Sequence, residues 1–176
     1  MKRIIVMLLL VLMLFGCAAP QAPTTQGETE PTAQAVKAPD FTVYDGQGQE
    51  VRLSDLKGKP VVLNFWASWC GPCKREMPDF QEAFEEVGGQ VQFMMVNLTD
   101  GSGETVESAS AFIAGQGYTF PVFFDTDSDA ARAYGIRSIP TTFFIDAQGN
   151  VVTYAIGMID GQTLQNGIDR IKAAQE

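Results

Sequence analysis

Two cysteines, Cys70 and Cys73, are the residues whose type and spacing point most directly to chemistry. They follow an apolar run, residues 61–66, that predicts a buried strand, and residues 74–87 predict a helix directly after them. Cys70 therefore lies at a helix N-terminus, where unpaired backbone N–H groups and the helix dipole favour a thiolate. A thiolate is the nucleophile of disulfide exchange, and a second thiol three positions later can attack the first within one helical turn. The pattern predicts a redox-active dithiol–disulfide site.

Other uses of the cysteine pair have less support. A zinc site needs about four ligands. The chain has no histidine, and its only other cysteine, Cys17, lies far away in a different kind of segment. A purely structural disulfide stays open, although so short a loop removes little entropy from the unfolded chain. We expect no metal and no cofactor beyond the Cys70–Cys73 disulfide itself.

The residues around the cysteines resemble a known family. Residues 64–78, NFWASWCGPCKREMP, are similar to the active-site stretch of the TlpA/ResA-like thiol–disulfide oxidoreductases, which are membrane-anchored members of the thioredoxin superfamily. Residues 53–60 and 139–143 fit the same family in the expected order. The resemblance runs from about residue 39 to the C-terminus. It implies a thioredoxin-like fold and reduction of protein disulfides.

The resemblance also assigns residues to the client-binding surface. Pro140 would be the cis-proline that faces the thiols, and the backbone of Ile139 would pair with an extended client chain. Gly71 and Pro72 are similar to the residues between the cysteines of reducing thioredoxins. Trp69 is expected to form the apolar rim of the site. Ordinary packing of Trp69 and an ordinary proline at a strand start are the alternatives.

Glu76 is the candidate proton acceptor for the thiol that must ionise during turnover. It lies three residues after Cys73, and helical side chains lean toward the N-terminus, so its carboxylate can approach the thiols. Thioredoxin has a buried acid in the preceding strand, whereas this chain has Asn64, which cannot take a proton. The alternative is a surface glutamate that complements the helix dipole.

The N-terminal residues predict export and a lipid anchor. Residues 1–16 read as a signal peptide, with two cations followed by twelve apolar residues, 4–15, too few for an ordinary membrane span. Residues 14–17 resemble a bacterial lipobox, in which Cys17 is lipidated and becomes the mature N-terminus. Lipidation of Cys17 would leave Cys70 and Cys73 as the one cysteine pair. An uncleaved anchor and a plain secretory signal are the alternatives.

Residues 17–38 are expected to be the lipidated cysteine followed by a disordered linker. The linker contains Ala, Pro, Gln, Thr and Glu, with no aromatic residue and Val36 as its only branched aliphatic residue. Such a tether would hold the domain near the membrane. We therefore expect a bacterial membrane lipoprotein whose catalytic domain, residues 39–176, lies on the extracytoplasmic side.

The domain's elements predict an α/β fold with a mixed central sheet and helices on both faces. The fold would be thioredoxin-like, with an N-terminal β-hairpin and an inserted strand–helix unit. The expected elements are hairpins over residues 41–44 with 51–53 and 141–146 with 151–156, strands over 91–96 and 120–124, and helices over 104–115, 129–134 and from 160 onward.

Charge and motifs exclude several other functions. The net charge of −9 argues against nucleic-acid binding. Residues 125–129 imitate the start of a calcium loop, but Ala130 and Ile136 stand where glycine and glutamate are required. We expect a turn that caps a helix instead.

The sequence as a whole predicts an extracytoplasmic, monomeric reductase of protein disulfides. Resemblance implies a membrane thiol donor of the CcdA or DsbD kind and apocytochrome c as a possible client. A thioredoxin-fold thiol peroxidase is one alternative, although Ala67 occupies the place of the threonine found before the peroxidatic cysteine. The other alternative is a non-enzymatic surface-binding lipoprotein with a structural disulfide.

Overall fold

A computed structural model describes residues 36–174, which belong to one compact unit. Its centre is an eight-stranded mixed sheet with the strand order β1-β8-β7-β4-β5-β6-β2-β3. The strands are β1 Val36–Lys37, β2 Thr42–Tyr44, β3 Glu50–Arg52, β4 Val61–Trp66, β5 Gln92–Asn97, β6 Val122–Phe124, β7 Thr141–Ile145 and β8 Asn150–Ile156.

Strand β4 lies in the middle of the sheet and leads directly to the cysteines. It pairs in parallel with β5 and antiparallel with β7. All six of its residues are buried, because the sheet is covered on both faces. This explains the almost unbroken apolar run in the sequence. The strand therefore provides a rigid base for the turn that follows it.

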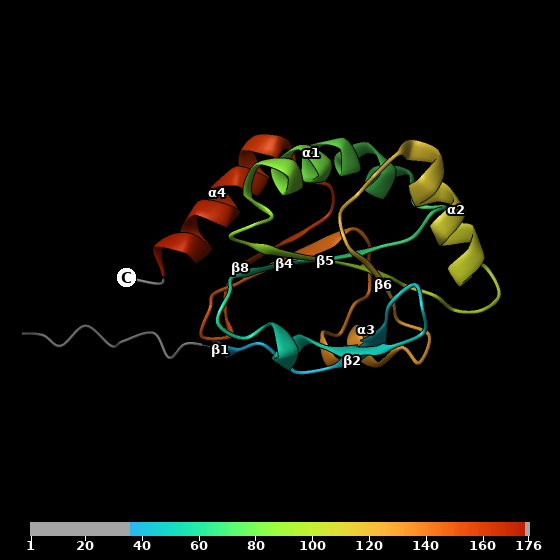
Figure 1. The fold of residues 1–176 in the computed structure, drawn as a ribbon, viewed down its shortest axis with the longest axis horizontal. Coiled ribbons are helices and arrows are strands. Elements are labelled where there is room, and N and C mark those ends of the chain that lie inside the picture. Colours follow the sequence, from blue (N-terminus) through green and yellow to red (C-terminus); the bar gives the residue numbers. More distant parts are fainter. Residues whose placement is uncertain (1–35, 175–176) are drawn as a thin grey trace, which may run out of the picture. The chain divides into compact units, whose positions relative to one another are not determined.

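Helices cover both faces of the sheet, as predicted (Figure 1). Helices α1 Gly71–Val87, α2 Val106–Gln116 and α4 Gly161–Ala173 pack on one face around a core that includes Trp66, Phe80 and Ile168. The short helix α3 Asp129–Ala133 and the 3-10 helix η1 Leu53–Leu56 pack on the other face, where Phe41 and Phe65 are buried.

The predicted turn before α3 is confirmed. The carboxylate of Asp125 accepts hydrogen bonds from the backbone N–H groups of Ala130 and Ala131, at 3.0 and 2.8 Å. The acidic segment thus caps the short helix with its own side chain.

Most element boundaries shift by one or two residues from the prediction, and two differences are larger in consequence. Helix α1 begins at Gly71 rather than near residue 74, because Cys70 caps it and Pro72 suits its first turn. Strand β1, at the end of the segment predicted to be a linker, pairs Val36 with Val151 and Lys37 with Asn150. Its two residues join the sheet through the backbone, which composition does not reveal.

The predicted signal peptide, Cys17 and residues 18–35 lie outside the described residues.

Candidate active site

Cys70 and Cys73 are joined as a disulfide at the N-terminus of α1. Cys70 is the N-cap residue, with an extended backbone, and its Sγ accepts a hydrogen bond from the backbone N–H of Cys73 at 3.1 Å. The sulfur of Cys70 therefore receives one of the N–H groups that a helix start leaves unpaired. This is the environment in which a thiolate is favoured.

The two cysteines differ from the neighbouring tryptophan in exposure. Cys73 is fully buried and Cys70 is almost so, whereas Trp69 is 62% exposed. Trp69 therefore does not fill a core position, and the packing alternative is wrong for it. A large aromatic side chain held in solvent directly before Cys70 forms an apolar rim beside the disulfide.

The loop before β7 faces the sulfur of Cys70. The Ile139–Pro140 peptide bond is cis, as the family resemblance implied. The carbonyl oxygen of Ile139 lies 3.8 Å from the Sγ of Cys70. The carbonyl oxygen of Pro140 accepts a hydrogen bond from the Gly157 N–H at 2.8 Å. The end of β8 is therefore fixed against this loop.

Two apolar residues flank Gly157 and were not predicted as part of the site. Ile156 is 68% exposed and Met158 is 49% exposed. Their signal in the sequence is an apolar pair around a glycine just after a strand, but the sequence does not place them near the cysteines. The hydrogen bond between Gly157 and Pro140 places this exposed pair next to the cis-proline loop that faces Cys70.

Glu76 is buried on the inner side of α1, with 1% of its surface exposed. Its Oε1 accepts a hydrogen bond from Asn64 Nδ2 at 2.9 Å, and its Oε2 accepts one from the Ile159 N–H at 3.0 Å. Burial raises the pKa of the Glu76 carboxyl to about 7, and the two hydrogen bonds oppose this rise only in part. The surface-glutamate alternative is therefore wrong.

Asn64 connects Glu76 to the neighbouring strand. The residue is fully buried in β4, and its Nδ2 also donates to the Oγ1 of Thr142 at 3.0 Å. Its Oδ1 has no hydrogen-bond partner among the described residues. Because an amide cannot ionise, Glu76 is the titratable member of this buried group.

A second buried glutamate, Glu104, was missed from the sequence. Its carboxylate accepts hydrogen bonds from the backbone N–H and the Oγ of Ser68, both at 2.7 Å, and from Asn97 Nδ2 at 2.6 Å. Ser68 lies two residues before Cys70 in the turn between β4 and α1. Glu104 therefore ties this turn to the loop that follows β5.

Comparisons with known proteins agree with this geometry. The sequence model of the AhpC/TSA family matches residues 35–154. Thiol-disulfide oxidoreductase ResA of Geobacillus thermodenitrificans (strain NG80-2) is 40% identical over 147 residues, which is 82% of each chain. ResA of Bacillus subtilis (strain 168) is 35% identical, over 83% of this chain and 80% of its own. The chain belongs to the AhpC/TSA family and to its ResA-like members. It is a thiol–disulfide oxidoreductase, and protein thiols and disulfides are its clients in general.

Solved structures confirm the thioredoxin-like fold. The match to StoA from Bacillus subtilis has a TM-score of 0.65 with 29% identity and covers 74% of this chain and 97% of StoA. The exposed lipoprotein thioredoxin Etrx1 from Streptococcus pneumoniae strain TIGR4 gives 0.62 with 36% identity, over 74% of this chain and 98% of its own. Both matches cover nearly the whole solved chain, so a unit of this extent folds on its own.

Proposed function

We propose that this oxidoreductase reduces protein disulfides outside the cytoplasm, with Cys70 as the attacking thiol and Cys73 as the resolving thiol. The observation that carries the proposal is the position of Cys70 at the N-cap of α1, beside an exposed apolar rim. Cys73 lies one turn further into the helix and is fully buried. A client sulfur therefore meets Cys70 first.

The proposed reaction has two exchanges. The Cys70 thiolate of the reduced enzyme attacks one sulfur of the client disulfide, and the other client sulfur leaves as a thiolate and takes a proton. Cys73 then loses its proton and attacks the Sγ of Cys70. The second client sulfur leaves, so the client gains two electrons and the enzyme becomes the Cys70–Cys73 disulfide.

Glu76 is proposed to take the proton of Cys73 in the second exchange. Residues three apart share one face of a helix, and Glu76 is buried on the same side of α1 as Cys73. A pKa of about 7 suits this carboxyl to proton transfer near neutral pH. The hydrogen bonds from Asn64 and Ile159 would hold the carboxylate in place between turnovers.

The client chain is proposed to bind in an extended form across the rim. Trp69 on one side and Ile156 with Met158 on the other would cover apolar client side chains. The Ile139 backbone, with its carbonyl 3.8 Å from the Cys70 sulfur, would pair with the client backbone beside the reacting disulfide. Because the backbone is common to all proteins, such a site would accept many sequences.

A lipid anchor is the proposed means of attachment to the membrane. The signal-like residues 1–16 and the lipobox-like residues 14–17 support it, as does the description of Etrx1 as an exposed lipoprotein. Among residues 36–174 no helix combines the length and apolar character needed to cross a membrane.

Cys17→Ser should release the protein from the membrane fraction while its reductase activity persists. Retention after a carbonate wash would favour an uncleaved anchor.

Resemblance to the ResA-like family supports two more specific partners. An exported reductase consumes electrons, so a membrane thiol relay of the CcdA or DsbD kind is the proposed donor. Apocytochrome c is the proposed client, and its reduction would precede haem attachment. Pull-down of either partner by a single-cysteine variant would test these assignments separately.

A thiol peroxidase is the second candidate, because the matching family model is that of the AhpC/TSA family. Against it, the buried Ala67 has no hydroxyl to bind a peroxide where peroxidases place a threonine. The reduced protein should therefore reduce the disulfides of insulin, and Cys70→Ser should abolish this activity. Hydroperoxide consumption at a comparable rate would favour the peroxidase.

A further inference from the structure

The lysines of this acidic chain gather at one end of the domain. The net charge is −9 and the sequence has six lysines. Four of them line two adjacent cavities, which share Lys59. We call this surface the lysine face, and its residues are Lys37, Lys57, Lys59 and Lys172. Only Lys74, beside the cysteines, lies elsewhere among the described residues.

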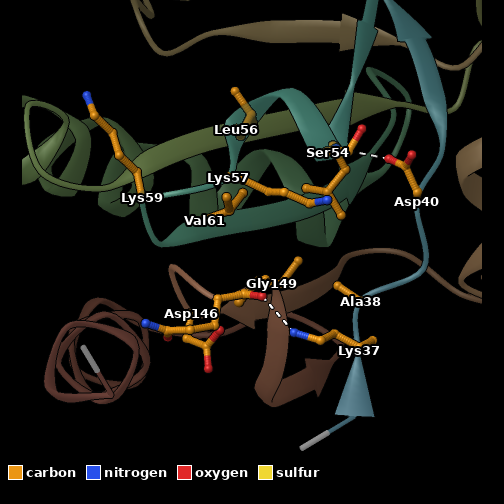
Figure 2. Close-up of a pocket in the computed structure, with 13 residues that line it drawn as sticks. Lys37, Ala38, Asp40, Ser54, Leu56, Lys57, Lys59, Val61, Asp146 and Gly149 are labelled. Carbon is orange, nitrogen blue, oxygen red and sulfur yellow. Dashed lines mark hydrogen bonds between the residues drawn. The ribbon is translucent and has the colours of Figure 1, made fainter. Parts of the chain in front are cut away.

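The larger cavity of the lysine face has an apolar floor and charged walls (Figure 2). Its volume is about 360 Å³, and its floor includes Leu53, Val61 and Ile145. Figure 2 shows Lys57 on the side of η1 and β4 and Lys37 on the opposite side, next to the turn at Gly149. A small anionic group with an apolar body would fit between these two ammonium groups.

The acidic residues of the same cavity already have partners. Asp40 pairs with Arg52 at 2.6 Å and accepts a hydrogen bond from the Ser54 N–H. Asp146 accepts two hydrogen bonds from Asn150. Among residues 36–174, no lysine of the face forms an ion pair with a carboxylate, and Lys37 donates only to the backbone oxygen of Gln148. Because the Asn150 amide is neutral, Asp146 keeps its charge and offsets one of the four lysines, and the face retains a net positive charge.

The lysine face lies where the N-terminal segment joins the domain and far from the disulfide. Lys37 is part of β1, the first described strand. Val61 lines the cavity and begins β4, which ends at Trp66, shortly before the cysteines. Six residues of strand span roughly 20 Å. The attachment point and the lysines thus share one end of the domain, and the disulfide lies toward the other.

We propose that the lysine face binds anionic phospholipid headgroups of the membrane that holds the N-terminus. This inference rests on the extracytoplasmic, anchored location proposed above. The lysines bind the phosphates and the apolar floor covers the glycerol region of a headgroup. The rest of the domain is acidic and is repelled by the same surface, so the contact sets an orientation. The disulfide then faces away from the bilayer toward soluble clients, and release of this weak contact lets the domain turn to a membrane donor.

Lysine labelling on vesicles tests the proposal. Residues 34–176 with an N-terminal histidine tag are held on vesicles by a nickel-chelating lipid, which imposes the tether whatever the state of Cys17. The chain has no histidine of its own, so attachment is at one point. Amine acetylation is then compared between phosphatidylcholine vesicles and vesicles that also contain phosphatidylglycerol. We expect about fivefold protection of Lys37, Lys57, Lys59 and Lys172 on the anionic vesicles, lost at high salt, and no change at Lys74. Equal labelling on both vesicles, or equal protection of Lys74, overturns the proposal.

Matched variants identify the charges responsible. Lys37→Gln/Lys57→Gln should remove most of the protection at Lys59 and Lys172. Lys74→Gln/Arg75→Gln, which changes the net charge equally at the cysteine end, should leave it intact. Insulin reduction in solution reports the proposed function separately: normal reduction without lysine protection overturns the lipid contact alone.

The acidic residues of the N-terminal segment are the competing occupant. Glu28 and Glu30 precede β1 in the sequence. If residues 18–176 show protected lysines in solution without lipid, and Glu28→Gln/Glu30→Gln removes that protection, the face binds its own segment and the lipid proposal is wrong. Unprotected lysines in that experiment support the lipid.

Discussion

Two buried glutamates near the active-site cysteines have different surroundings. Glu104 accepts three short hydrogen bonds, two of them from Ser68 in the turn before Cys70. Glu76 accepts only two, from Asn64 and from the backbone of Ile159, and burial raises its pKa to about 7. Glu104 holds the turn before Cys70 through these contacts, whereas the raised pKa of Glu76 suits the proton transfer proposed for it.

Removal of the Glu104 carboxylate should have the largest effect on stability. Glu104→Ala leaves the Ser68 N–H, the Ser68 hydroxyl and the Asn97 amide without their buried acceptor, so the free energy of unfolding should fall by roughly 4 kcal/mol. Urea denaturation measures this change. Glu86→Ala, at an exposed position of α1, is the control and should cost less than about 0.5 kcal/mol. If Glu104→Ala lowered the free energy of unfolding as little as the control does, Glu104 would have no structural role.

The raised pKa of Glu76 predicts a stability that depends on pH. An acid with a higher pKa in the folded state binds more protons there, so its contribution is complete below the unfolded pKa, near 4.5, and is lost as pH rises through about 7. The free energy of unfolding should fall by about 3 kcal/mol across this interval relative to Glu76→Gln. Urea titrations of both proteins at several pH values measure the difference. Parallel pH curves would contradict the raised pKa.

Glu76→Gln should also slow client reduction near neutral pH, by roughly 10-fold to 100-fold. General bases contribute about 10²–10⁴-fold, and water that reaches the site would lessen the loss. Insulin reduction over a range of pH measures the effect, and the variant should lose the step in rate near pH 7. Glu82→Gln, an exposed neighbour on α1, should leave the profile unchanged. If Glu76→Gln and the parent protein had the same pH–rate profile, Glu76 would not be the proton acceptor.

The smallest effect is expected on the rim, where neither glutamate acts. Trp69→Ala should raise the KM for a protein client several-fold and leave reduction of a small disulfide unchanged, because only a protein reaches across the exposed indole. Steady-state kinetics with insulin and with oxidised glutathione separate the two outcomes. Equal loss with both clients would mean that Trp69 supports the fold of the turn instead.

Local patterns in the sequence predicted the redox pair and most of the fold. The cysteine spacing, the apolar run of β4 and the turn residues act over a few positions, so the sequence carries them directly. Glu76 was predicted from its helical spacing, but its burial depends on Ile159, 83 residues away. The role of Glu104 depends on Ser68, 36 residues away, and no local sequence pattern indicates it. The burial of Glu76 and the role of Glu104 could not be predicted because both depend on contacts between distant segments.

The central claim is that Cys70 attacks the client and Cys73 releases it. Trapping of clients by the two single-cysteine variants in living cells tests it most directly. Cys73→Ser should accumulate mixed disulfides with client proteins, because the first exchange proceeds and the resolving thiol is missing. Cys70→Ser should trap few clients, since the remaining thiol is fully buried. Equal trapping by both variants, or more by Cys70→Ser, would contradict the assignment.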